Sequence, residues 1–172
     1  KEFNALKSVN YKFISEVTMK NAYYYDTKIG KITIVDNGKS ITNLEFGEVR
    51  YKDVDYIETP LMKNAYNQLQ EYLDGKLKSF DIPIEENGTE FQRKVWKALR
   101  EIPYGETWSY KQLAERAGNI KACRAVGGAN NKNPISIITP CHRVIGANGK
   151  LVGYGGGLDI KEKLLDLESE FK

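Results

Sequence analysis

The sequence of 172 residues has few of the side chains that build metal centres or disulfide frameworks, with two cysteines and one histidine. A structural zinc site takes four such ligands, and a three-ligand catalytic zinc would use every cysteine and histidine in the chain. We therefore predict no metal and no other cofactor, although counting leaves carboxylate-bound magnesium or calcium open. No EF-hand or P-loop spacing occurs. Both cysteines are interpreted as free thiols, because intracellular thiols are normally reduced.

The sequence also lacks long apolar runs. No run approaches the roughly 18 to 20 residues that span a bilayer, and the opening residues KEFNALKSVNYKF show no apolar core or cleavage site of a signal peptide. We expect a soluble, cytoplasmic protein with no membrane partner.

Positive charge is concentrated in one part of the chain. The formal net charge of +3 combines a balance of −2 over residues 1–89 with +5 over 90–172, and the segment 91–158 alone reaches +8. Such a segment favours a nucleic-acid-binding surface, and the alternative is an ordinary solvated surface with mixed charges. Charge alone leaves both readings open.

The first half of the chain reads as strands followed by a helix. Residues 11–19 and 28–35 alternate apolar and polar side chains, and Asp36-Asn37-Gly38 is a turn that joins the latter to 40–46 in a hairpin. A helix is expected after Pro60, ending at Gly75, and 80–84 is a possible further strand. Its apolar face is Leu61, Ala65, Leu69, Tyr72 and Leu73. The polar stretch 85–88 is the expected linker.

The second half is predicted to be mostly helical. Thr89 can cap one helix, and Ser109-x-x-Gln112 is a capping box that opens a short helix over 110–117. A third helix is expected from near Ile120. Two short helices joined by a tight turn with Gly118 have the form of a helix-turn-helix, a motif that is weak on its own.

A cysteine and the only histidine are adjacent after an apolar, β-branched run. The run 135–139 predicts a strand that stops at Pro140 and presents Cys141, His142 and Arg143 at its end. A thiol is mostly protonated at neutral pH, so a nucleophilic cysteine needs a base or a positive charge beside it. The alternative is structural, with Cys141 as a small buried hydrophobe and His142 as a satisfied polar residue.

The combination of these features resembles a known family. Pro140 to Val144 reads Pro-Cys-His-Arg-Val, and with the flanking RAVGG, NP and GYGGG segments it is similar to the C-terminal domain of O6-alkylguanine-DNA alkyltransferases, the methylated-DNA–protein-cysteine methyltransferases, over about residues 90–170. The resemblance implies an α+β fold. A small antiparallel sheet plus helix, ribonuclease H-like, would occupy 1–85, and a mostly α-helical domain with a helix-turn-helix would occupy 86–172.

The resemblance implies a single-turnover DNA repair reaction. Cys141 would take an alkyl group, such as methyl, from O6 of guanine and keep it as a thioether, and O4 of thymine is a second candidate position. His142 would act as the base through a water, and Glu168 would orient the imidazole. Asn133 would fix the turn before the active-site strand, and Tyr110 would donate a hydrogen bond to the flipped base.

Further residues are implied to hold the base. Backbone carbonyls at Cys141 and Val144 would accept from its exocyclic amine, and the loop from Tyr154 would close the pocket. Gly155 stands where many relatives have a serine, so a side-chain contact to O6 is lost. Lys161 would also contact the substrate. Ser136 stands where some relatives have a proline.

The implied partner is double-stranded DNA, bound through the minor groove without sequence preference by a monomer. Arg124 would fill the space that the flipped nucleotide leaves. Ala125, Gly127 and Gly128 would allow close approach, and Lys121 would contact phosphate. Two alternatives remain: a module that binds the lesion without reacting, against which Cys141 argues, and a thiol hydrolase with a Cys-His-Glu triad, which the basic balance disfavours.

Overall fold

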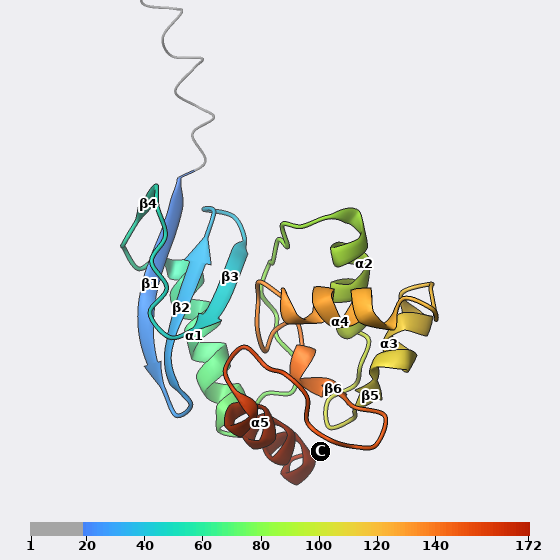
Figure 1. Cartoon of the computed structure of the whole chain (residues 1–172). Helices are drawn as coiled ribbons and strands as arrows, with labels where there is room; N and C mark the ends of the chain where they lie inside the picture. The colour runs from blue at the N-terminus through green and yellow to red at the C-terminus, as the bar shows by residue number, and fades with distance from the viewer. Residues whose placement is uncertain (1–18) are drawn as a thin grey trace, which may run out of the picture.

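The computed structural model describes residues 19–172 and shows a small sheet beside a group of helices (Figure 1). The sheet has the order β3-β2-β1-β4. Its strands are β1 (Lys20–Thr27), β2 (Gly30–Asp36), β3 (Ile41–Phe46) and β4 (Val54–Asp55). The first three are antiparallel neighbours, whereas the two-residue β4 runs parallel to β1.

The predicted hairpin is confirmed as β2 and β3. Its turn is closed by a hydrogen bond from Asn37 N to Ser40 O of 3.1 Å, and Gly38 has a φ of +86°, which favours glycine. The possible strand at 80–84 is reduced to a single bridge between Ile84 and Ile41. Of the strand predicted at 11–19, residues 11–18 lie outside the described residues.

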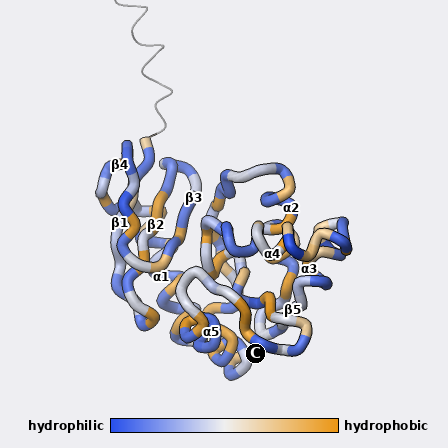
Figure 2. Tube along the Cα trace, viewed as in Figure 1, coloured by the Kyte–Doolittle hydropathy of each residue, from blue (hydrophilic) through white to orange (hydrophobic). Residues whose placement is uncertain are grey.

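Helix α1 (Pro60–Leu73) covers one face of the sheet, as its apolar spacing predicts. The Thr59 side chain caps it by accepting from Met62 N, and Pro60 occupies the first turn, where its missing N–H costs nothing. Its buried residues share a core with β2, β3 and Leu164 of the C-terminal helix α5 (Leu158–Glu170). In Figure 2, β2 is largely hydrophobic and the edge strand β4 is mostly hydrophilic.

Three helices surround a second core. They are α2 (Glu90–Leu99), α3 (Tyr110–Arg116) and α4 (Cys123–Asn131). Both predicted capping boxes form, Thr89 with Gln92 and Ser109 with Gln112. Helices α3 and α4 pack together across a short connection, as the helix-turn-helix pattern predicts. Helix α4 begins three residues later than expected, because Ala122 N and Asn119 O first close a turn at 3.0 Å.

The strand predicted at 135–139 is wrong. Residues 135–139 form turns and isolated bridges, and Ile137 has a φ of +72°, which is unusual for a β-branched residue. Two prolines without N–H groups flank the segment, and hydrogen bonds from Ile138 N to Ser136 O at 2.9 Å and from Thr139 N to Ile135 O at 3.0 Å turn it back on itself. Cys141–Arg143 is a short 3-10 helix, η1, followed by β6 (Val144–Ile145), which pairs in parallel with β5 (Trp108–Ser109).

The architecture as a whole confirms the predicted α+β class, with a small sheet and helix followed by a mostly helical half. The division at residues 85 and 86 stays a prediction. Within residues 19–172, no helix is both long and apolar enough to cross a membrane.

Candidate functional site

Cys141 begins η1 and lines a pocket of about 220 Å³. Its side chain is almost completely buried, and its backbone N–H donates to Thr139 O at 2.9 Å. The pocket wall comes from four parts of the chain: β3 and the segment after it, the end of α4, the loop before η1, and the loop before α5. Its residues are Glu45, Phe46, Val49, Asn130, Asn131, Asn133, Ser136, Cys141, Gly153, Tyr154 and Gly155.

Asn133 shapes the loop that carries Cys141. Its side-chain amide donates to Thr139 O at 2.7 Å, and its Oδ1 accepts from Ile135 N at 3.0 Å. One side chain thus ties both ends of the tight loop that replaces the expected strand, and it also lines the pocket.

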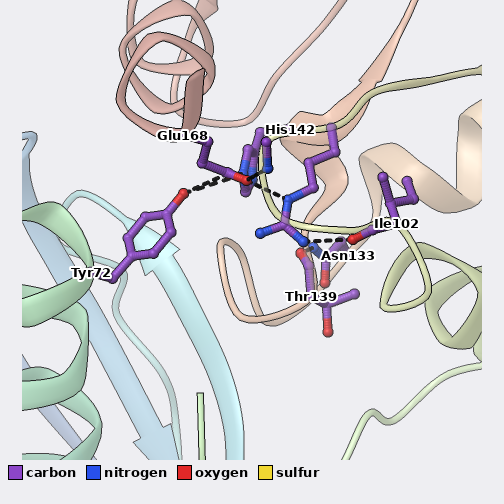
Figure 3. A network of polar contacts seen from close by, with 8 residues as sticks. Tyr72, Ile102, Asn133, Thr139, His142 and Glu168 are labelled. Carbon is purple, nitrogen blue, oxygen red and sulfur yellow. Dashed lines mark hydrogen bonds and ion pairs between the residues drawn. The ribbon is translucent and has the colours of Figure 1, made fainter. Parts of the chain in front are cut away.

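His142 and Glu168 form a buried pair beside Cys141 (Figure 3). Both side chains are almost entirely buried, and His142 Nε2 is hydrogen-bonded to Glu168 Oε2. Helix α5 brings Glu168 to η1 from 26 residues further along the chain. The structure therefore joins the Cys-His pair to the acidic residue expected to orient the imidazole.

Glu168 accepts hydrogen bonds from several further donors. Arg143 Nε donates to Oε1 at 2.7 Å, Gly105 N donates to the same oxygen at 3.1 Å, and the Tyr72 hydroxyl donates to Oε2 at 2.8 Å. Burial alone would raise the pKa of this carboxyl, but the hydrogen bond from His142, the charge of Arg143 and the Gly105 N–H together lower it to about 2. Glu168 is therefore a carboxylate at neutral pH.

This environment defines the state of His142. Burial lowers its pKa, and the positive charges of Arg143 and Lys161 act in the same direction against the opposing effect of Glu168. A neutral imidazole that donates from Nε2 to a carboxylate keeps its lone pair on Nδ1. Nδ1 is buried and has no hydrogen-bond partner among the described residues, so it is available as a base.

The Cys141 thiol is not activated by its surroundings alone. Burial raises its pKa, and the hydrogen bond of Asn133 and the charge of Lys161 offset only part of this effect. The thiol thus needs a proton acceptor to become a nucleophile, and His142 is the next residue along the chain.

The Lys161 side chain is completely buried. Its ammonium donates to Val144 O at 2.6 Å and to Val152 O at 3.0 Å, and it lies 3.5 Å from Gly153 O. These contacts hold the loop before α5 against η1 and β6. Lys161 therefore contacts the wall of the pocket and is shielded from solvent.

The residues expected to hold the base gather near the pocket. The Tyr110 hydroxyl donates to Val152 O at 3.3 Å, and its pKa is raised by burial and by the nearby Cys141, so it stays protonated. Tyr154 lines the pocket with its hydroxyl buried and unpartnered among the described residues. Gly155 is exposed, and a Cβ at that position would meet no atom within 4 Å.

The residues expected to contact DNA lie on the outer face of α4 and the turn before it. Lys121, Arg124, Ala125 and Gly128 are exposed, and Gly127 is half-buried. A Cβ on Gly127 would lie 3.7 Å from the Tyr110 ring. Helix α4 therefore packs directly against the residue that is expected to donate a hydrogen bond to the flipped nucleobase. The opposite face of α4 is buried through Val126, Ala129 and Asn130.

Sequence reasoning missed Tyr72 and the role of Arg143. The sequence predicts Tyr72 only as an apolar position of a helix. In the structure its hydroxyl lies 3.4 Å from His142 Nε2 and donates a hydrogen bond to Glu168. Arg143 also donates to Ile102 O at 2.7 Å. A fully buried tyrosine usually hydrogen-bonds its hydroxyl, which is the one sequence signal that points beyond packing. Among residues 19–172, no group of three or more His, Cys, Asp or Glu side chains is placed to hold a metal ion.

Both halves of the chain match described families. Residues 21–85 match the family described as 6-O-methylguanine DNA methyltransferase, ribonuclease-like domain, and residues 90–170 match 6-O-methylguanine DNA methyltransferase, DNA binding domain. The chain belongs to the 6-O-methylguanine DNA methyltransferase family.

Individual relatives are similar over most of their length. The methylated-DNA–protein-cysteine methyltransferase of Methanosarcina barkeri is 53% identical over 152 residues, covering 84% of this chain and 96% of the relative. The methylated-DNA–protein-cysteine methyltransferase of Mycobacterium bovis is 49% identical over 146 residues, covering 83% of this chain and 88% of the relative. The crystal structure of Mycobacterium tuberculosis OGT in complex with DNA has a TM-score of 0.83 at 46% identity, covering 88% of this chain and 94% of that one.

Proposed function

We propose that this protein repairs DNA by transferring an alkyl group, methyl above all, from O6 of guanine to Cys141, in a reaction that each molecule performs once. The observation that carries the proposal is the placement of the Cys141 thiol in a pocket, next to a neutral histidine held by a buried carboxylate. We also propose O4-alkylthymine as a second substrate.

The chemistry balances with the groups present. The thiol proton moves to His142 Nδ1, directly or through one water, while Glu168 stabilises the positive charge that the imidazole gains. Sγ forms a bond to the alkyl carbon as the carbon–O6 bond breaks, and the electron pair leaves with guanine. Guanine takes up a proton at N1, so the overall proton count is unchanged. A thioether is a stable product, which makes Cys141 unavailable for a second round.

The leaving guanine needs hydrogen-bond donors and acceptors to hold it. Tyr110 would donate to the base, and its raised pKa keeps the phenol protonated as the donor. The backbone carbonyls of Cys141 and Val144 would accept hydrogen bonds from the exocyclic amine of guanine. Adenine carries its amine at a different position, so these contacts would discriminate between the two bases. Val144 O already accepts from Lys161, and a carbonyl oxygen has a second lone pair for this contact.

Base flipping would bring the target to this pocket. O6 lies inside the duplex stack, so the nucleotide must leave the helix at a cost of a few kcal/mol. The exposed face of α4 would enter the minor groove, Arg124 would fill the vacated space, and Lys121 would contact phosphate. The balance of +8 over residues 91–158 supports binding to the backbone of any DNA sequence. We also propose that the protein works as a monomer in the cytoplasm, with access to the genome.

The test is incubation of the full chain with a duplex that carries one O6-methylguanine, followed by the intact mass of the protein and the base content of the DNA. We expect a gain of one methylene that saturates at one per chain, with an equal amount of guanine restored. The variant Cys141→Ala should bind the duplex and gain nothing. Tight binding without any gain, or continued demethylation beyond one equivalent, would each overturn the proposal.

A further inference from the structure

The pocket at Cys141 has one wall that the reaction above does not use. Glu45, Phe46 and Val49, from β3 and the segment after it, line the same pocket as Cys141. The first half of the chain therefore contributes side chains to the place where the substituent on O6 must lie. Glu45 is the only Asp or Glu on this wall among the described residues.

Backbone pairing fixes Glu45 next to the active-site loop. Leu44 N donates to Pro134 O at 2.9 Å, and Ser136 N donates to Leu44 O at 3.0 Å, so β3 pairs with the loop that Asn133 shapes. Across this pairing, Ser136 also lines the pocket. On the other side of Glu45, the Phe46 ring packs edge-on against Tyr154 with centroids 5.5 Å apart. The backbone pairing at Leu44 and the ring contact at Phe46 therefore fix the position of Glu45 in the pocket wall.

The Glu45 carboxyl differs from that of its neighbour Glu48 in its contacts with the part of the chain that the structure describes. Its Oε2 atom is buried and accepts no hydrogen bond among residues 19–172, and no ion pair of Glu45 occurs within that part of the chain. In contrast, the nearby Glu48 pairs with Lys31 at 3.1 Å on the surface. Burial raises the pKa of Glu45, which is the effect expected of a carboxyl without a compensating positive charge.

We propose that Glu45 is a specificity-determining residue that disfavours anionic substituents on O6, such as carboxymethyl, relative to neutral substituents of the same size. This inference rests on the proposed alkyl transfer and names the selection that the same pocket applies. In-line attack places the alkyl carbon at Sγ, so the rest of the substituent extends into the space that Glu45 borders. A second negative charge in that space is repelled by the carboxylate, and salt screens such a repulsion little in a partly buried site.

The effect of charge can be separated from the effect of substituent size by using a neutral substituent of the same shape. Carbamoylmethyl has the shape of carboxymethyl and carries an amide in place of the carboxylate. Duplexes that differ only in methyl, carbamoylmethyl or carboxymethyl on O6 are reacted with the full chain at about pH 8, above the ordinary range of a carboxyl pKa. The single-turnover rate of alkyl transfer to the protein is followed by intact mass.

The wild-type protein should transfer carbamoylmethyl at least about tenfold faster than carboxymethyl, and Glu45→Gln should reduce this ratio by about tenfold, a change of about 1.4 kcal/mol. Glu45→Ala should shift the ratio in the same direction, and the control Glu48→Gln should leave it unchanged. A ratio that Glu45→Gln does not alter, while methyl transfer proceeds, overturns the inference alone. Absence of methyl transfer from the wild type would instead overturn the proposed function.

Discussion

The hydroxyl of Tyr72 donates to Oε2 of Glu168 at 2.8 Å, across 96 residues of sequence. Tyr72 belongs to α1, which packs on the sheet, whereas Glu168 belongs to α5 and contacts His142. The helix against the sheet therefore contributes directly to the residues that control the reactive thiol (Figure 3). Tyr72 does not line the pocket at Cys141, so its role in our account is that of a positioning residue.

Tyr72→Phe removes this donor and keeps the ring. A hydrogen bond to a charged group contributes about 1.5–3 kcal/mol, so we expect a loss of roughly that size in the free energy of unfolding, measured by urea titration. With one donor fewer, Glu168 attracts the His142 proton more strongly. The acid limb of the transfer rate should therefore move to higher pH, which a purely structural role would not cause.

The control for this variant is Tyr66→Phe on the same helix. Tyr66 donates to Asp26 O at 2.7 Å near the surface, so its loss should leave the pH profile in place. An unshifted acid limb in Tyr72→Phe would contradict the positioning role.

The pH dependence of transfer follows from the state of His142. Its pKa is lowered below the ordinary value of about 6.5, so the imidazole stays neutral and able to accept a proton down to a lower pH. Glu168, with a pKa of about 2, stays ionised over this whole range. The single-turnover rate on O6-methylguanine duplex should therefore hold from about pH 8 to 6.5 and decline only below. A decline that begins above pH 7 would contradict a depressed histidine pKa.

Arg124→Ala tests base extrusion. The Arg124 side chain is proposed to fill the space that the flipped nucleotide leaves in the base stack. Its removal should slow repair of duplex O6-methylguanine by about tenfold or more, because moving the nucleotide out of the stack costs a few kcal/mol. The reaction with free O6-benzylguanine needs no extrusion and should change by less than about threefold. Lys163→Ala removes one exposed positive charge from α5 and serves as the control. Equal losses with duplex and free base would exclude the assigned role.

Gly155→Ser should increase the rate of methyl transfer. A Cβ at this position meets no atom within 4 Å, and its φ lies outside the left-handed region, so a serine fits without strain. Its hydroxyl would supply a donor to O6 as charge develops there, and we expect a gain of about three- to tenfold. Gly155→Ala adds the same Cβ without the hydroxyl and should show no gain. Similar rates in the two variants would rule out a contact to O6.

The sequence predicted those parts of the fold that depend on neighbours along the chain. The capping boxes at Thr89 and Ser109 join residues three apart, and the hairpin turn at Gly38 depends on a local φ, so each was visible as a short pattern. The helix-turn-helix was recognisable for the same reason. Residues of the site could be assigned because they resemble a known family, not because spacing alone revealed them.

Long-range contacts were not predictable in this way. The β-branched run 135–139 favours a strand by propensity, yet two flanking prolines and the Asn133 contacts fold it into a tight loop. Beyond helical spacing, Tyr72 offered only the general tendency of a buried tyrosine hydroxyl to form a hydrogen bond, and its partner lies on another helix near the end of the chain. Glu45 reaches the pocket only through the pairing of β3 with that loop.

The central claim is that Cys141 is the alkyl acceptor, and peptide mapping after reaction with O6-methylguanine duplex tests it most directly. The chain has two thiols, Cys123 on α4 and Cys141 in the pocket, in separate peptides after cleavage at lysine and arginine. Our account predicts one methyl group on the peptide of residues 133–143 that contains Cys141, saturating at one per chain, and an unmodified Cys123. A methyl group on Cys123, or on neither thiol while the DNA is repaired, would contradict it.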